Sequence, residues 1–182
     1  MAGVVTAVNR LGKWFNRRTL LGTGVAGLAA VSVAKAAEAK SIDVVKAIIL
    51  AWRGLDVEGV MKYLADDIVW YSHVGGAAPL VGKAACRAFV VALGKRITDN
   101  KWRVFNMAAN GNSVFCEGVD DFTATDGKQI TVPYMGIMTV RNGLVVAWRD
   151  YFDGAMVDRM KRGEFDFAKD PSGPLMTRKP LF

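Results

Sequence analysis

The sequence predicts an α+β fold in which a curved antiparallel (mixed) sheet wraps around three helices to form a cone with an apolar pocket. Two observations predict it. Helical spacing of apolar residues dominates the chain between about residue 40 and residue 95, and four long strand-like runs follow. A sheet of that length curls and must bury one face, and the helices are the only elements available to fill its concave side.

Three segments have the apolar spacing of amphipathic helices, over residues 41–53, 56–64 and 83–95. Ser41 can cap the first of these helices at its N-terminus, and Asp56 can begin the second, short helix. A side chain of this kind accepts a hydrogen bond from a backbone N–H in the first helical turn, which would otherwise lack a partner. These segments are therefore predicted to form the helical layer.

The strand-like runs cover residues 101–109, 113–124, 129–141 and 144–153. They are separated by the turn signals Asn-Gly-Asn, Asp-Gly and Asn-Gly, which predict antiparallel hairpins. An earlier strand is expected over 68–73, between the second and third helices. A further helical turn is expected near residues 155–161.

The first 39 residues are typical of an export signal. The pair Arg17-Arg18 leads into an apolar run from Leu20 to Ala34, and a stretch of small residues follows. The arginine pair resembles twin-arginine signals, so we expect the twin-arginine export machinery as a partner and a periplasmic or extracellular location. The apolar run is shorter than the about 20 residues that a membrane span needs, so no stable span is expected in the mature form. The alternative is that the leader is kept as an anchor.

Three units are therefore expected along the chain: a signal peptide over 1–39, one folded domain over 40–160 and an extended C-terminal arm over 161–182. The whole chain has a formal charge of +7, with 24 basic and 17 acidic residues. The leader holds five of the basic residues and one acidic residue, so the remainder carries about +3. That charge does not call for a nucleic acid or another polyanion as a partner.

The residues that could hold a metal or form disulfides are few. His73 is the only histidine, and Cys86 and Cys116 are the only cysteines. Without a Cys/His cluster, no metal and no cofactor are expected. The cysteines are expected as two buried thiols, with a single disulfide as the alternative in an oxidising compartment.

Side-chain alternation along the strands singles out two acids. Asp120 shares a strand face with Phe122, and Asp150 shares one with Trp148 and Phe152. An acid among large apolar residues is costly unless it is paired or functional. Two such carboxylates on neighbouring strands could share a proton, so that one acts as general base and the other as general acid. The alternative is that each acid is exposed or paired with a neighbouring arginine.

Two stretches of the strand half resemble a known family. CEGVDDF at 116–122 and GLVVAWRDYFD at 143–153 are similar to limonene-1,2-epoxide hydrolases. These belong to the nuclear transport factor 2-like superfamily, together with the SnoaL-like polyketide cyclases and the ketosteroid isomerases. The resemblance covers roughly residues 42–160. It implies a cystatin-like or nuclear transport factor 2-like fold.

The resemblance also implies roles for particular residues. Asp150 would activate a water molecule and Asp120 would protonate the epoxide oxygen. Tyr71 and His73 take the positions that help to hold the water, with His73 where the family has Asn. The Arg that bridges the two acids in the family falls on Gly118. This departure favours one proton shared between the acids, and a cationic His73 could partly replace the Arg.

The rest of the pocket is expected to be apolar and to bind the substrate. The expected substrate-binding residues are Trp148, Phe122, Val132, Tyr134, Gly118 and Phe152. The function expected is a cofactor-independent hydrolase that adds water to the epoxide of a small lipophilic substrate through the Asp/Asp pair. The alternatives are a SnoaL-like isomerase or cyclase with one Asp as base, or a non-catalytic domain that binds small molecules or dimerises. Since family members commonly dimerise through the outer face of the sheet, a homodimer is expected.

Overall fold

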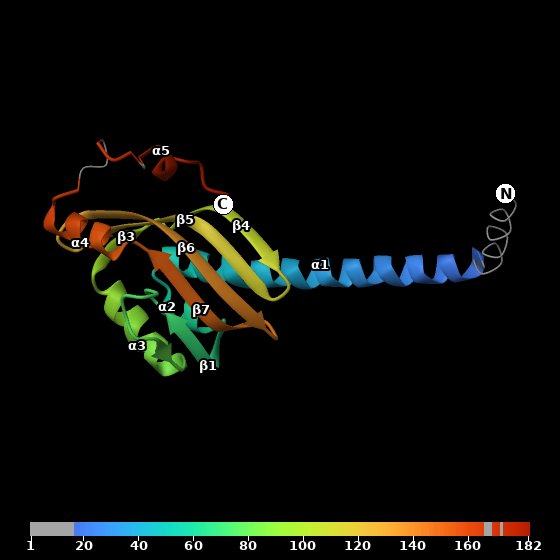
Figure 1. Cartoon of the computed structure of the whole chain (residues 1–182). Helices are drawn as coiled ribbons and strands as arrows, with labels where there is room; N and C mark the ends of the chain where they lie inside the picture. Colours follow the sequence, from blue (N-terminus) through green and yellow to red (C-terminus); the bar gives the residue numbers. More distant parts are fainter. Residues whose placement is uncertain (1–16, 166–168, 172) are drawn as a thin grey trace, which may run out of the picture. The chain divides into compact units, whose positions relative to one another are not determined.

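The computed structural model describes residues 17–165, 169–171 and 173–182 (Figure 1). The chain divides into two compact units, the second of which is Ala37–Phe182. The N-terminal part of the predicted export signal, residues 1–16, lies outside the described residues. Among the described helices, none is long and apolar enough to cross a membrane.

Five helices are present among the described residues. They are α1 (Arg17–Arg53), α2 (Val57–Met61), α3 (Lys83–Gly94), α4 (Gly154–Arg162) and α5 (Gly173–Met176). Asp56 caps α2 as predicted, because its side chain accepts a hydrogen bond from the backbone N–H of Gly59 at 2.9 Å. The prediction that Ser41 caps the first helix is wrong. The alanine-rich residues before it continue the helix, and Ser41 Oγ donates to the Ala37 carbonyl oxygen inside it.

The strands form one mixed sheet. They are β1 (Leu64–Tyr71), β2 (Leu80–Val81), β3 (Ile97–Asn100), β4 (Arg103–Asn110), β5 (Ser113–Ala124), β6 (Gln129–Arg141) and β7 (Leu144–Phe152). Their order is β2-β1-β7-β6-β5-β3, with β4 also paired to β5. β1 runs parallel to β7, and the other neighbouring pairs are antiparallel. The predicted curled α+β fold is therefore confirmed.

The hairpins that the turn signals predict are present. β4, β5, β6 and β7 follow one another as antiparallel neighbours. At the β6–β7 turn Asn142 has φ 53° and Gly143 has φ 77°. Two successive positive φ angles define the type I′ turn, which asparagine and glycine tolerate best.

The sequence did not predict the two short strands, β2 and β3. β2 has only two residues, and β3 contains the Asp99-Asn100 pair, whose residue types are typical of a turn. β1 also begins and ends earlier than predicted, since it contains the Asp66-Asp67 pair and stops at Tyr71. Both aspartates of this pair are exposed, in a stretch where the pairing of β1 with β7 shifts register, between Leu64 and Val69.

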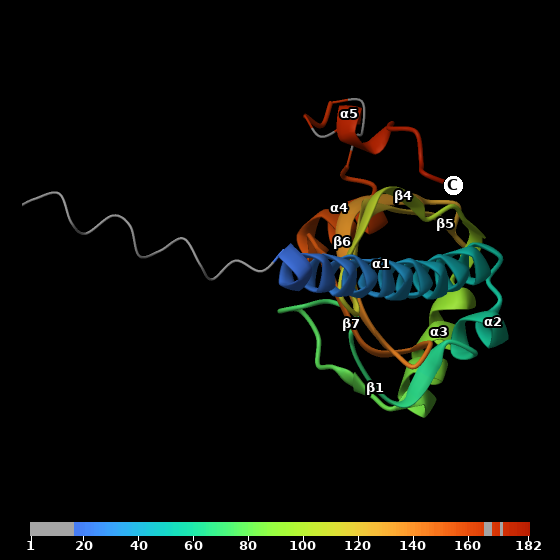
Figure 2. The ribbon, with the colours of Figure 1, turned by 90° about the vertical axis from the view of Figure 1, so that its right-hand side faces the viewer.

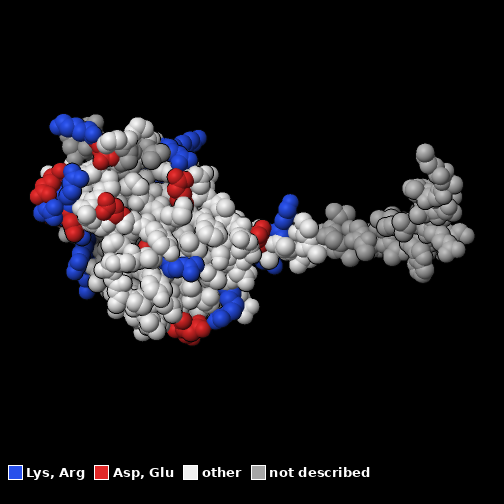
Figure 3. Space-filling model, in the orientation of Figure 1, with Lys and Arg blue, Asp and Glu red and all other residues white. Residues whose placement is uncertain are grey.

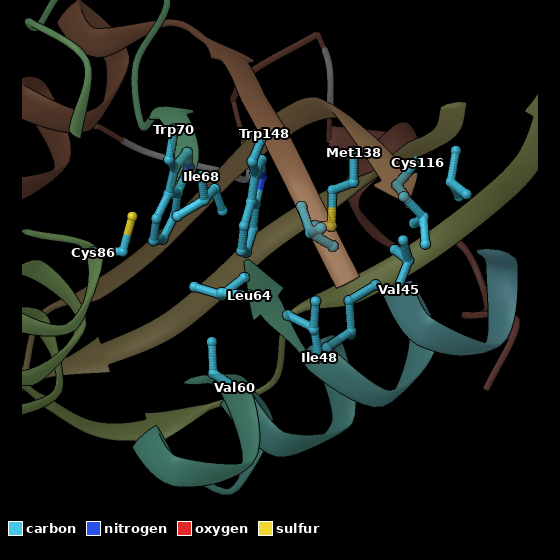
Figure 4. Packing of buried hydrophobic residues seen from close by; sticks show 14 of the residues in the cluster. Val45, Ile48, Val60, Leu64, Ile68, Trp70, Cys86, Cys116, Met138 and Trp148 are labelled. Atoms are coloured by element: carbon cyan, nitrogen blue, oxygen red, sulfur yellow. The ribbon is translucent and has the colours of Figure 1, made fainter. Parts of the chain in front are cut away.

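The core fills the concave side of the sheet. Figure 2 shows the sheet curling around the part of α1 that belongs to this unit, residues 37–53, which supplies Val45 and Ile48 to the core. In Figure 4 these two side chains point toward Leu64, Met138 and other sheet residues. Cys86 and Cys116 belong to the same cluster, and both are buried free thiols as predicted. On the face shown in Figure 3, basic and acidic side chains lie beside one another near α4.

The chain returns to the sheet at its C-terminus. The backbone N–H of Leu181 donates to the Val104 carbonyl oxygen at 2.8 Å, and Arg53 Nη1 donates to the Phe182 carbonyl oxygen at 3.1 Å. Met176 of α5 is buried against Phe105 and the outer face of β5. The region predicted as an extended arm therefore holds the end of α4, the short helix α5 and a final segment that hydrogen-bonds to β4.

Candidate functional site

A cavity of about 1010 Å³ opens on the concave face of the sheet. Side chains from the sheet and from the helices α1, α2, α3 and α4 form its wall. Most of the side chains expected to bind substrate line it: Phe122, Val132, Tyr134, Trp148 and Phe152. Both candidate acids, Asp120 and Asp150, line it as well. Strand alternation therefore placed these seven side chains correctly.

Asp150 is held on both of its carboxylate oxygens. Trp70 Nε1 donates to Oδ2 at 2.9 Å, and Trp148 Nε1 donates to Oδ1 at 2.7 Å. The two indole rings stack with their centroids 4.1 Å apart and their planes 12° apart. Burial raises the pKa of Asp150 to about 7, although the two indole donors oppose that rise. Asp150 is therefore fixed in place and poised to exchange a proton near neutral pH.

Asp120 is also half-buried, but its surroundings differ. Burial raises the pKa of Asp120 to about 6, and the neighbouring charge of Asp121 adds to the rise. No hydrogen bond from a described residue reaches the Asp120 side chain. Asp121 lies on the opposite strand face, where Arg103 Nε and Thr131 Oγ1 each donate to it at 3.0 Å. The adjacent acids therefore have separate roles: Asp121 is locked in a hydrogen-bond network and Asp120 is left open to the cavity.

The register of the sheet fixes how the two cavity acids are spaced. Asp120 on β5 lies opposite Val132 of β6, whereas Asp150 on β7 lies opposite Gly136 of β6. Tyr134 lies between these two β6 positions on the same face. A Cβ at Gly136 would lie 3.2 Å from Asp150 Oδ1 and 3.3 Å from Tyr134 Cε2. Glycine at this position therefore lets the Asp150 carboxylate lie close to the tyrosine ring.

His73 lines the cavity, as its predicted role requires. Its ring stacks on Phe152 with centroids 4.3 Å apart and an interplanar angle of 20°. Gly76 and Gly154 lie close to the imidazole. A Cβ at Gly76 would be only 2.1 Å from its Nδ1, and a Cβ at Gly154 only 2.6 Å from its Cε1. The imidazole therefore sits in a slot where β1, β7 and α4 meet.

Tyr71 does not take its predicted place. It pairs with Arg149 of β7, and its side chain is 39% exposed on the outer face of the sheet. Trp70 takes the inward position instead, and it pairs with Trp148. The prediction came from the family resemblance, but alternation within β1 turns Trp70 inward and Tyr71 outward, and the chain bends directly after Tyr71. Tyr71 therefore cannot hold a water in this cavity.

Gly118 also departs from its predicted role. It does not line the main cavity of the described structure but a smaller hollow of about 190 Å³. A Cβ at this position would lie 2.1 Å from the Arg103 carbonyl oxygen and 3.0 Å from Val104 Cα. The backbone of β4 occupies the space where a side chain would be, so this fold has no room for an arginine at 118.

Sequence reasoning missed two residues of the site. Trp70 supplies one of the two donors to Asp150, and Trp102 lines the cavity, with its ring parallel to that of Trp148 at a centroid distance of 6.1 Å. The alternation of Ile68 and Trp70 within β1 was the available signal for the first. Among the described residues, no three His, Cys, Asp or Glu side chains gather as a metal site would need.

This fold and cavity define a class of small α+β domains whose curled sheet encloses a ligand pocket. Residues 45–148 match the model of the SnoaL-like domain, so the chain belongs to that family within the nuclear transport factor 2-like fold.

Solved structures agree on the fold. An LEH-like epoxide hydrolase of M. tuberculosis is 24% identical, with a TM-score of 0.61 over 69% of this chain and 92% of that one. A putative polyketide cyclase of Xanthomonas campestris is 18% identical, with a TM-score of 0.61 over 68% of this chain and 98% of that one. An NTF2-like protein of unknown function from Burkholderia pseudomallei is 23% identical, with a TM-score of 0.61 over 66% and 96%.

Proposed function

We propose that this protein is a cofactor-independent hydrolase that adds water to the epoxide of a small lipophilic substrate. The observation that carries the proposal is the pair of carboxylates, Asp150 and Asp120, in one largely apolar cavity. Burial raises the pKa of both toward neutral pH. The pair can therefore hold one proton between them, which leaves one base and one acid available together.

In the proposed reaction Asp150 takes a proton from a water molecule while the water oxygen attacks one epoxide carbon. The bond between that carbon and the epoxide oxygen breaks, and the epoxide oxygen takes a proton from Asp120. The product is a vicinal diol, and transfer of the proton from Asp150 back to Asp120 restores the starting state. The apolar wall would hold the carbon skeleton beside the acids.

The hydrogen bonds support Asp150 as the base. Its two indole donors stabilise the carboxylate form and fix its direction, whereas no described residue donates to Asp120. The order of the pKa values, about 7 for Asp150 and about 6 for Asp120, favours the reverse assignment, with Asp120 as the base and Asp150 as the acid. Substitution by asparagine separates the two, because an amide can still donate a hydrogen bond to the epoxide oxygen but cannot take a proton from water.

The test uses the full chain with a panel of terpene and steroid epoxides in oxygen-18 water. A labelled diol is expected, with a rate that falls at least about 1000-fold in Asp150→Asn and less in Asp120→Asn. Asp66→Asn is the control, since that side chain is 98% exposed and, among the described residues, pairs with Lys83 alone. The larger loss identifies the base, and a panel that yields no labelled diol contradicts the proposal.

One observation favours a second candidate, an isomerase or cyclase that uses a single Asp as base. Among the described residues, no cationic side chain forms an ion pair with Asp120 or Asp150. The two acids therefore lack the bridging arginine of the limonene-1,2-epoxide hydrolases, although Arg96, Lys128 and Lys161 also line the cavity. Rearranged product without label in the same experiment supports this candidate, and tight binding without turnover supports a binding domain.

We also propose a homodimer and export by the twin-arginine pathway. Four exposed large side chains lie on the outer sheet face: Tyr71, Phe115, Met135 and Tyr151. Cross-strand register places Phe115 beside Ile137 and Met135 beside Tyr151, so they form one apolar patch. Burial of this patch by a second copy would be favourable. Sedimentation of the full chain is expected to give a dimer that Met135→Asp dissociates, and a monomeric parent chain contradicts it.

A further inference from the structure

Two polar groups in the cavity wall have no use in the proposed reaction. Tyr134 Oη and Trp102 Nε1 are buried and have no hydrogen-bond partner among the described residues. Tyr134 is 7% exposed and Trp102 is 5% exposed, and both side chains line the main cavity. A buried donor left without a partner costs about 1–3 kcal/mol, so such groups call for an explanation.

The two groups lie close together. Their ring centroids are 5.8 Å apart, with an angle of 59° between the planes. The Trp102 N–H lies near enough to the phenol oxygen to lower the pKa of Tyr134, against the much larger rise that burial causes. The pair does not meet the geometry of a hydrogen bond. Because burial raises its pKa, the Tyr134 phenol stays protonated at neutral pH. Because it has no hydrogen-bond partner among the described residues, its O–H is free to donate.

The surrounding structure holds both side chains in position. Tyr134 lies on β6 between Gly118 of β5 and Phe152 of β7. The Trp102 carbonyl oxygen accepts a hydrogen bond from Arg53 Nε at 2.9 Å, which ties this residue to α1. The donors are thus preorganised, and a ligand would not have to order them on binding.

The charges nearby determine which ligand groups the two donors can bind. Tyr134 lies between Val132 and Gly136, the two β6 residues that lie opposite Asp120 and Asp150. Burial raises the pKa of Tyr134, and the charges of these two carboxylates add to the rise. A ligand carboxylate or phosphate at this point would be repelled by them. A cation, such as a protonated amine, would offer no acceptor to the two donors. The remaining chemistry is a neutral oxygen acceptor on a lipophilic ligand.

We propose that Tyr134 Oη–H and Trp102 Nε1–H together bind a carbonyl oxygen of the ligand, so that the cavity selects ketone- or ester-bearing lipophiles over hydrocarbons of the same shape. The inference rests on the proposed function only in taking this cavity as the substrate site. It adds that the substrate carries a carbonyl group besides the group that reacts. Trp102 and Tyr134 are thus specificity-determining residues, separate from the acid–base pair.

The test compares carvone with limonene, which share a carbon skeleton and differ by the ketone. Equilibrium dialysis of the full chain gives a Kd for each ligand. Tyr134→Phe removes the hydroxyl and is expected to weaken carvone binding about tenfold, since one good hydrogen bond is worth about tenfold in affinity. The Kd for limonene is expected to stay within about twofold of that of the parent chain. Trp102→Phe is expected to lower the carvone-to-limonene preference in the same direction.

The control is Tyr151→Phe, which removes a hydroxyl from an exposed tyrosine on the outer sheet face and should leave both Kd values unchanged. If Trp102→Phe fails to fold, Tyr134→Phe alone tests the inference, because this substitution removes a single oxygen atom. An unchanged carvone-to-limonene ratio in Tyr134→Phe, or no measurable binding of carvone by the parent chain, overturns the inference. Neither ligand carries an epoxide, so this outcome is independent of the oxygen-18 experiment.

Discussion

The indole Nε1 of Trp70 on β1 donates a hydrogen bond to Asp150 Oδ2 on β7 at 2.9 Å. The contact joins two parallel strands from opposite ends of the domain sequence. Together with the Trp148 donor on Oδ1, it leaves the carboxylate no freedom to rotate. The paired indoles also explain how an acid in an apolar cavity keeps a pKa as low as about 7, because each donor stabilises the charged form.

Trp70→Phe should therefore raise the pKa of Asp150. The substitution keeps an aromatic ring but removes one of the two donors, and a donor to a charged group is worth about 1.5–3 kcal/mol. The titration midpoint of Asp150, followed by carbon-13 NMR of its carboxyl group, should move upward by about one to two pKa units. Trp52→Phe is the matched control, since Trp52 lines the same cavity but does not donate to Asp150. An unmoved midpoint in Trp70→Phe would mean that the donor does not stabilise the carboxylate.

Asp120→Asn should stabilise the protein at alkaline pH. The folded-state pKa of Asp120, about 6, lies above its ordinary value of 3.8, so the folded state binds more protons between about pH 4 and pH 6. Stability therefore falls as pH rises through this window and stays reduced above it. Asparagine removes that loss, and the free energy of unfolding in urea should rise by about 2–3 kcal/mol at pH 8.

The same substitution should have little effect on stability at pH 4, where Asp120 is protonated in the folded state. Asp66→Asn provides the comparison for a carboxyl group in solvent. A gain of equal size at both pH values would show that the effect of Asp120→Asn does not come from its charge.

The regular hairpins were the part of the molecule that the sequence predicted best. β5 and β6 pair without a register shift from Ser113 to Thr123. Alternation therefore carries through, and Asp120 faces the cavity as predicted. The role of Tyr71 came from the family resemblance instead, and it is wrong because alternation within β1 turns Trp70 inward and Tyr71 outward.

Contacts between distant segments were the part that alternation could not predict. The donor from Trp70 to Asp150 depends on which strand lies next to β7, and residue patterns within a strand do not give that order. The crowding at Gly118 also depends on contacts between segments. The β4 backbone approaches this glycine where the pairing of β4 with β5 shifts register, between Val104 and Asn106. Trp102 lies in a short connection between β3 and β4, where no periodicity is available.

Gly118→Ala should destabilise the fold. The added Cβ would lie 2.1 Å from the Arg103 carbonyl oxygen, so β4 would have to move away from β5. Overpacking of this kind costs about 1–3 kcal/mol, measured as a lower urea midpoint. Gly94→Ala is the control, because its Cβ would meet the Trp52 ring at ordinary distances, 3.6 Å to Cη2 and 3.9 Å to Cζ3, and alanine favours the helix. Equal stability of the Gly118 variant and the parent chain would show that β4 yields without cost.

The rate of diol formation should depend on pH as a narrow bell. The productive state of the pair holds one proton, and with pKa values of about 6 and about 7 that state is most populated between these pH values. The rate should fall below about pH 6, because both acids are then protonated, and above about pH 7, because both are then ionised. Measurement of kcat/KM from pH 4.5 to pH 9 on a responsive epoxide tests this. Asp120→Asn leaves only Asp150 to titrate, so its residual activity should keep the acidic limb and lose the alkaline one. A parent profile that stays flat from pH 5 to pH 8 would exclude the Asp pair as the source of both proton transfers.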